Sequence, residues 1–323
     1  MKHTLILLVA SCLVAFAETD EQMNKSFPAQ LGGKLVVDVD FGSIDVTTSA
    51  SNEVTVDVYR TVTRSSKADE EAFLQDRPII FSQEGNTVTV SSRAKTKNKN
   101  WWQGNKRTEA KYTIAVPRSF NAQLKTSGGG VSVKDLSGDV KAETSGGGFR
   151  FDRLHGTLTA TTSGGAIHVS ECEGPLKVRT SGGGIDVTGG SGSLDGETSG
   201  GPVTVKDFRG PARLESSGGG LTIENVAGKV DGSTSGGSIS ARFSSPLSDE
   251  VKLETSGGGV TLRVPDSSAF DLDAATSGGS VASDLPVSVV GKVNHSHLKG
   301  PVNGGGKPVH LRTSGGSIHI KKT

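Results

Sequence analysis

The sequence contains few cysteines and few aromatic residues, and it has no excess of either charge. Two cysteines in 323 residues exclude a disulfide-dense scaffold, and an aromatic content of 5% excludes a core built mainly from aromatic rings. The formal net charge of +1 lacks the basic bias of nucleic-acid-binding domains, so we expect no nucleic-acid partner. Glycine, by contrast, is abundant: 45 residues, about twice its usual share.

Long hydrophobic runs are also missing, apart from one at the N-terminus. Residues 1–17 have the pattern of a signal peptide, in which Lys2 and His3 precede an apolar stretch from Leu5 to Val14 and Ala15-Phe16-Ala17 forms the cleavage site. The apolar stretch is too short to span a bilayer. We therefore expect an exported protein that is not transmembrane and that is periplasmic, cell-surface or secreted.

The same segment allows a second interpretation, a lipoprotein anchored at Cys12. Val9-Ala10-Ser11-Cys12 resembles a lipobox, but the residues that follow Cys12 are apolar where a lipoprotein normally turns polar. Cleavage after Ala17 is therefore the favoured prediction. The mature chain then keeps Cys172 as its single cysteine, and no intrachain disulfide is expected.

The main feature of the chain is an internal repeat. A Thr/Ser-Ser-Gly-Gly motif recurs with a spacing of 18 residues, then twice with a spacing of 21 and once with a spacing of 37. A fixed period of this kind is the signature of a solenoid. The motif begins at Thr126, Thr144, Thr162, Thr180, Thr198, Ser216, Thr234, Thr255, Thr276 and Thr313.

Apolar residues keep step with this repeat. Within each unit two apolar residues stand two positions apart, as Val131 and Val133 do, which is the spacing of side chains on one face of a strand. Frequent glycine pairs exclude a helix. Stacked units bury apolar faces that a single unit leaves exposed. The prediction is an all-β protein, a parallel β-solenoid of about ten coils with about 18 residues each.

Two columns of small residues define the corners of each coil. Gly138 and its successors at intervals of 18 lie midway between the apolar pairs, where we expect a backbone conformation that only glycine adopts freely. The threonines of the repeat motif are expected to form a ladder of hydrogen bonds at the other corner. Cys172 occupies an apolar column, so we interpret it as a small hydrophobic core residue.

The chain divides into four segments by pattern. Residues 1–17 are the signal peptide, and residues 18–27 are expected to be a short linker. Residues 28–123 are expected to form a more irregular β-rich capping region that contains a basic loop. We also expect one short helix there, at Ala68–Gln75, capped by Ser65 or Ser66. Residues 124–323 form the repeat solenoid.

Several of these segments resemble a known family. Gly42-Ser43-Ile44-Asp45-Val46, Tyr112-Thr113-Ile114-Ala115-Val116-Pro117 and the serial Thr-Ser-Gly-Gly units are similar to exported bacterial glycine-rich β-strand-repeat proteins. That family is labelled as adhesins and as a domain of unknown function. The resemblance implies an extracytoplasmic β-solenoid, and it supplies no catalytic residues.

The strongest candidate binding site is a break in the pattern between Arg93 and Arg107. This stretch carries cations and both tryptophans but no acidic residue. Cations interleaved with aromatic rings suit an anionic polysaccharide or lipid headgroups, whereas the structural alternative is a hairpin tip with solvated charges. The candidate residues are Lys95, Lys97, Lys99, Trp101, Trp102, Lys106 and Arg107.

A weaker candidate is a metal half-site. His295 and His297 stand two residues apart on one side of a predicted strand, and His310 or Asp284 are conceivable third ligands. The surrounding segment breaks the repeat and is rich in glycine, proline and asparagine, so an exposed loop is the alternative. We expect no cofactor.

No catalytic motif accompanies these features. The sequence contains no Gly-x-Ser-x-Gly, His-Glu-x-x-His or Cys-x-x-Cys. The primary hypothesis is a non-catalytic interaction module that contacts a surface polysaccharide, an anionic lipid or another envelope protein. One alternative is a polysaccharide-acting enzyme that uses carboxylates of neighbouring coils. Another is a structural protein that self-associates through an open last coil, His310–Ile320.

Overall fold

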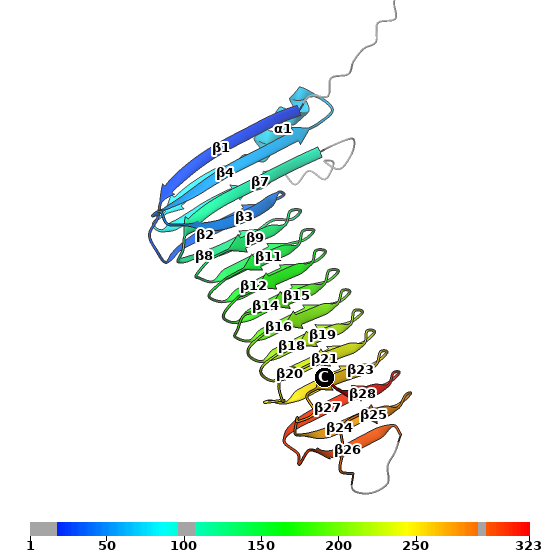
Figure 1. Ribbon diagram of the computed structural model, residues 1–323. Helices are drawn as coiled ribbons and strands as arrows, with labels where there is room; N and C mark the ends of the chain where they lie inside the picture. Colours follow the sequence, from blue (N-terminus) through cyan, green and yellow to red (C-terminus); the bar gives the residue numbers. More distant parts are fainter. Residues whose placement is uncertain (1–17, 96–106, 290–294) are drawn as a thin grey trace, which may run out of the picture.

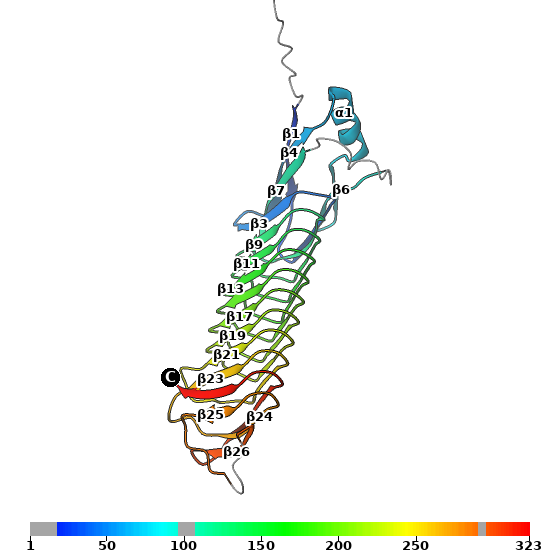
Figure 2. The ribbon, with the colours of Figure 1, turned by 90° about the vertical axis from the view of Figure 1, so that its right-hand side faces the viewer.

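The protein is an elongated stack of β-coils with a small cap at its N-terminal end (Figure 1). The computed structural model describes residues 18–95, 107–289 and 295–323. Two sheets of 14 strands each face one another along the whole stack, and Figure 2 shows its narrow side. The predicted all-β parallel solenoid is confirmed.

The first sheet runs from the N-terminal cap to the far end. Its strands are, in spatial order, β1 (Glu18–Pro28), β4 (Glu53–Thr63), β7 (Arg107–Pro117), β3 (Ser43–Ser49), β9 (Val131–Lys134), β11 (Phe149–Asp152), β13 (Ile167–Ser170), β15 (Ile185–Thr188), β17 (Val203–Lys206), β19 (Leu221–Glu224), β21 (Ile239–Arg242), β23 (Val260–Val264), β28 (Ile318–Lys322) and β25 (Val281–Ser283).

The second sheet runs beside it in the same direction. Its strands are, in spatial order, β5 (Ile80–Glu84), β6 (Thr87–Ser92), β2 (Gly33–Val39), β8 (Phe120–Lys125), β10 (Val140–Thr144), β12 (Leu158–Thr162), β14 (Leu176–Thr180), β16 (Leu194–Thr198), β18 (Ala212–Ser216), β20 (Val230–Thr234), β22 (Val251–Thr255), β27 (Lys307–Thr313), β24 (Phe270–Thr276) and β26 (His297–Val302).

Each coil contributes one strand to each sheet, and like residues stack in register. Val140 of β10 lies beside Leu158 of β12, which lies beside Leu176 of β14. Alternate side chains point inward, so the apolar columns of both sheets form one continuous core from Ala29 to Ile320. The N-terminal region therefore shares its core with the solenoid.

A threonine ladder joins successive coils at the corner that leads from the second sheet to the first. The hydroxyl of Thr180 donates to the carbonyl oxygen of Gly165 in the preceding coil, 2.8 Å away, and accepts from the N–H of Gly183 in its own coil. The same pair of contacts recurs from Thr144 to Thr313, and these side chains are buried. The expected hydroxyl ladder is confirmed.

Glycine serves two different needs at the two corners. At the corner opposite the threonines, Gly138 to Gly228 have φ between +124° and +152°, which confirms the expected glycine conformation. At the threonine corner the requirement is close approach, because a Cβ on Gly183 would lie 2.1 Å from the carbonyl oxygen of Gly165. One neighbouring column departs from this rule, since Arg153 and Glu171 hold φ of +51° and +50° without being glycine.

The N-terminal cap differs from its prediction in one respect. Residues 18–27, expected to be a linker, belong to strand β1, which pairs antiparallel with β4 along its full length. That long antiparallel pairing satisfies the backbone of the segment, so the linker assignment is wrong. The expected short helix is α1 (Lys67–Asp76), and Ser66 caps it by accepting from the N–H of Asp69.

Both ends of the stack contain a coil out of sequence order. The first coil, β2 and β3, lies between β6–β7 and β8–β9, and the last coil, β27 and β28, lies between β22–β23 and β24–β25. The expectation that His310–Ile320 forms an open edge is therefore wrong. Strands on both sides already take its backbone hydrogen bonds, and β25 and β26 form that end of the stack.

We predict that alanine destabilises one glycine position of a corner far more than the glycine position next to it. Gly183→Ala places its Cβ against the backbone of the preceding coil and lowers the free energy of unfolding by about 3 kcal/mol. In Gly182→Ala the nearest atoms lie 3.4 Å from the new Cβ, so stability changes by less than about 1 kcal/mol. Urea unfolding followed by circular dichroism measures both, and equal losses contradict the close-approach explanation.

We predict that Thr180→Val weakens the contact between coils. The substitution keeps the shape of the side chain but leaves the Gly165 carbonyl and the Gly183 N–H without their partner, which costs about 1–3 kcal/mol of stability. Thr188→Val is the control, because Thr188 is exposed on strand β15. A loss in the control as large as in Thr180→Val counts against the ladder.

Candidate functional site

The predicted basic loop connects β6 to β7 at the cap end of the stack. Lys97, Lys99, Trp101, Trp102 and Lys106 lie outside the described residues. Arg93, Lys95 and Arg107 mark the two ends of the loop where it joins the described strands. The structure therefore places the ends of the candidate site and leaves its central residues as a prediction.

The two arginines that flank this loop bind acidic neighbours. Arg93 donates from Nε to Asp38, 2.8 Å away, and from Nη1 to Asp40 at the same distance. Arg107 donates from Nε to Glu109 at 2.8 Å. The backbone N–H of Lys95 donates to the carbonyl oxygen of Asp76, next to the end of α1. These contacts engage the two flanking arginines with acidic neighbours.

A buried polar cluster lies between strand β4 and helix α1 in the N-terminal cap. Arg60 is fully buried and donates to Glu21 at 2.8 Å and to the carbonyl oxygen of Arg77 at 2.6 Å. The guanidinium carbons of Arg64 and Arg77 lie over the ring of Phe73, 4.0 and 4.7 Å from its centroid. This cluster was not among the predicted sites. The signal was available, because Arg60 continues the inward register of Val54, Val56 and Val58.

The histidine pair lies at the opposite end, in and beside strand β26. His297 Nε2 lies 3.1 Å from Asp273 Oδ1, and Arg312 Nη2 lies 2.9 Å from the same oxygen. Lys299 Nζ lies 3.7 Å from Asp273 Oδ2. Asp273 is thus surrounded by basic groups rather than by further metal ligands. Within residues 18–95, 107–289 and 295–323, no cluster of three or more His, Cys, Asp or Glu is arranged to hold a metal ion.

The surroundings of Asp273 shift its titration. Partial burial pushes the pKa of Asp273 up, but the hydrogen bond from His297 and the charge of Arg312 outweigh this, so its pKa lies below the ordinary value. Asp273 therefore stays ionised and holds β24, β26 and β27 together. The arrangement is structural in character.

Cys172 is part of the core, as expected. Its side chain is fully buried, and its Sγ donates to the carbonyl oxygen of Ser170 at 3.3 Å. Burial raises the pKa of Cys172 to about 11, so the thiol is not ionised at neutral pH.

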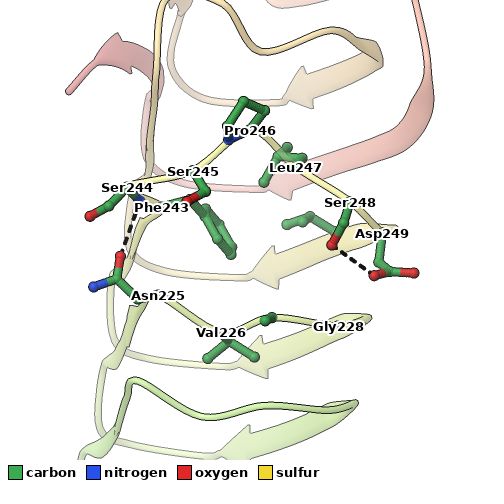
Figure 3. Close-up of a pocket in the computed structure, with 12 residues that line it drawn as sticks. Asn225, Val226, Gly228, Phe243, Ser244, Ser245, Pro246, Leu247, Ser248 and Asp249 are labelled. Carbon is green, nitrogen blue, oxygen red and sulfur yellow. Dashed lines mark hydrogen bonds between the residues drawn. The ribbon is translucent and has the colours of Figure 1, made fainter.

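One cavity of about 350 Å³ opens where a coil is three residues longer than the 18-residue coils before it (Figure 3). The longer loop, Ser244–Asp249, bulges away from the corner of the preceding coil. Phe243 and Leu247 line its apolar part, and Asn225 accepts from the N–H of Ser244. Asp249 is the one ionisable residue in the lining, and Ser248 donates to it. No histidine, cysteine or lysine accompanies this pair among the lining residues.

A second, shallower hollow of about 460 Å³ follows the threonine corner. Hydroxyl groups line it together with Glu197, Glu215 and Glu254. Each of these carboxylates lies within 3.2 Å of a cation, since Arg179, Arg213 and Lys252 are their partners. The described carboxyl groups with a displaced pKa, such as Glu143 and Asp273, are all displaced downward, whereas a general acid needs the opposite.

Across the described ranges no helix has the length and apolar character that a bilayer crossing needs. The core lies between the two sheets, and the charged side chains lie mainly on the outer faces and at the ends. The fold thus defines a parallel β-solenoid repeat protein whose outer faces are built of side-chain columns. The model of the Toastrack DUF4097 family matches residues 34–321, and the chain belongs to this family.

No curated protein matches the chain. Solved structures that resemble it include a "putative cell adhesion protein" from Clostridium sporogenes ATCC 15579, with 14% identity over 94% of this chain and 100% of that one and a TM-score of 0.24. A "putative adhesin" from Parabacteroides distasonis ATCC 8503 has 11% identity over 94% and 97%, with a TM-score of 0.45. A "Putative lipid binding protein" from the same organism has 13% identity over 94% and 96%, with a TM-score of 0.33.

We predict that Asp273→Asn destabilises the far end of the stack in a pH-dependent way. A carboxyl group with a lowered pKa contributes stability above its unfolded pKa of about 4, and that contribution is lost as the pH falls through the lower folded value. The variant is therefore less stable by about 1 kcal/mol at pH 7, and the difference shrinks below about pH 4.

Thermal unfolding between neutral and acidic pH measures this difference. Asp271→Asn is the matched control, because Asp271 is exposed on the same strand. A constant difference at every pH, or an equal effect in the control, contradicts the role given to Asp273.

Proposed function

We propose that this protein is an exported, non-catalytic interaction module of the cell surface or envelope, with adhesin-like binding as its function. The observation that supports this most strongly is that the charged side chains lie mainly on the outside of the stack. The core fills the space between the two sheets, and the charged columns cover the two outer faces. Such a molecule recognises a partner along its surface.

The solenoid supplies a stiff shaft for this purpose. Every coil is joined to its neighbours by two parallel strand pairings and by the threonine contact at the corner. A rigid surface loses little conformational entropy when it binds a partner, which favours recognition by several weak contacts. The signal peptide at residues 1–17 belongs to this proposal as the route of export.

The contact that we assign to a partner is the basic loop at the cap end. Lys97, Lys99 and Lys106 add positive charge, and Trp101 and Trp102 add flat apolar surface suited to sugar rings or to the region of lipid headgroups. The flanking arginines already bind Asp38, Asp40 and Glu109, so the central cations carry the electrostatic part. The ligand is therefore an acidic surface polysaccharide or an anionic lipid.

The two other hypotheses gain less support. The hypothesis of a polysaccharide-acting enzyme needs a carboxyl group with a raised pKa to serve as the general acid. Within the described residues, every carboxyl group with a displaced pKa has it lowered. Self-association through the last coil loses its basis, because β27 and β28 lie inside the stack. The end strand β26 also contains Gly300 and Pro301, which make it a poor template for a further strand.

We predict that Trp101→Ala combined with Trp102→Ala abolishes or strongly weakens binding to acidic glycans or anionic vesicles. The test is an array of acidic and neutral glycans and of anionic and neutral vesicles at about 0.01 M and about 0.15 M salt. Binding by the wild-type chain falls as salt rises, because screening weakens the contribution of the lysines. The double variant loses at least about tenfold in affinity.

The control is Tyr59→Ala, which removes an exposed aromatic side chain of the same cap. It leaves binding unchanged. Wild-type binding to none of the probes contradicts the proposed function, and equal binding by the tryptophan variant and the wild type contradicts the assignment of the contact.

A further inference from the structure

The outer face of the first sheet carries three stacked cations near the far end of the stack. Arg242 of β21 lies in register with Arg263 of β23, which lies in register with Lys321 of β28. Adjacent strands are about 4.8 Å apart, so the three positions span about 10 Å along the axis. We call these three residues the cation ladder.

The ladder exists because the last coil is intercalated. In sequence order the coil after β23 is β24–β25, which has Asp284 at the equivalent outward position. The structure inserts β28 between β23 and β25, and this places Lys321 next to Arg263 and moves Asp284 one coil further away. The topology thus extends a pair of cations to three.

None of the three cations forms an ion pair with a carboxylate of the described residues. Glu224, the next residue of the column on one side, binds Lys206 at 3.4 Å. Lys322, beside the ladder, binds Asp266 at 2.7 Å. Arg242 and Lys321 are exposed, and Arg263 is half-buried. The positive charge of the ladder is therefore left for the solvent or a ligand.

The second sheet shows the opposite arrangement. One of its outward columns alternates in sign from coil to coil, and cations such as Arg213 and Lys252 bind glutamates on their own strands. Like charges in register on neighbouring strands are unfavourable, so the ladder is not explained by stability. The alternating column is Lys177, Asp195, Arg213, Asp231 and Lys252.

Hydrogen-bonding groups accompany the ladder. Ser240, Thr261 and His319 form the neighbouring outward column on the same three strands. The result is a narrow strip along the axis, with a row of cations beside a row of hydroxyl and imidazole groups. A polymer whose units each carry an acid group and hydroxyls matches both rows, because the acid groups can pair with the cations and the hydroxyls can form hydrogen bonds with the second row.

We propose that the cation ladder is a binding site for a linear acidic polysaccharide that lies along the solenoid axis. The inference rests on the proposed binding function, and it names the ligand class and a second site far from the basic loop. A flat anionic membrane fits less well, because Glu224 and Asp284 bound the strip at its two ends and face the same side. A flexible polymer can turn away from the face at either end of the strip and so avoid both carboxylates, which a flat membrane cannot do.

The test compares two triple variants of the full mature chain. R242Q/R263Q/K321Q removes the ladder, and K141Q/R213Q/K252Q removes three cations from the second sheet that are paired with glutamates. Both sets lower the net charge equally. The probes are polygalacturonate, neutral dextran and phosphatidylglycerol vesicles, at about 0.01 M and about 0.15 M salt.

The ladder variant is expected to bind polygalacturonate at least about tenfold more weakly than the wild type, and the control variant within about twofold. Dextran is not bound. The melting temperature of the ladder variant does not fall, because the substitutions relieve repulsion between like charges. A folded ladder variant with weaker binding therefore supports a binding role for the three cations.

Four outcomes overturn the proposal. They are unchanged binding by the ladder variant, equal loss in both triple variants, loss accompanied by unfolding of the ladder variant, and binding of vesicles without binding of polygalacturonate. A K97Q/K99Q/K106Q variant separates the two sites. If it alone loses binding, the ladder fails and the proposed function stands, whereas a wild-type chain that binds no probe contradicts both.

Discussion

The hydrogen bond from a threonine hydroxyl to the glycine carbonyl of the neighbouring coil is the contact on which the stack depends. It is possible only because the facing corners carry no side chains, as the 2.1 Å approach expected for a Cβ on Gly183 demonstrates. The close approach and the hydrogen bond together keep the spacing and the rotation between successive coils constant. Part of the glycine content of the chain follows from this contact, and the glycines of positive φ at the opposite corner account for another part.

Regular stacking turns each outward residue into a member of a column. On the second sheet one outward column alternates in charge from coil to coil, and cations such as Arg213 bind a glutamate of their own strand, here Glu215. On the first sheet Arg242, Arg263 and Lys321 break that alternation. Most exposed charges are therefore neutralised in ion pairs, each of which contributes little stability. The unpaired cations of the ladder are a local exception, and a ligand can bind there.

The two ends of the stack are closed by chain segments that return from elsewhere. At the cap, β1 and β4 extend the first sheet by antiparallel pairing, and Arg60 carries its charge into the interior with Glu21 as partner. At the far end, Asp273 links three strands through His297, Lys299 and Arg312. These polar clusters lie at the two ends of the stack, where the 18-residue repeat stops.

The sequence by itself determined the coil, its register and its corners, because those depend on residues that recur every 18 positions. Val140 and Leu158 stack as the period requires, and Gly138 has the backbone conformation that its position indicated. Only the tertiary structure decided the ends, since the intercalation of β28 and the pairing of β1 are contacts between distant segments that leave no periodic signal. The cation ladder belongs to this second class. Its third member, Lys321, reaches Arg263 through the fold alone.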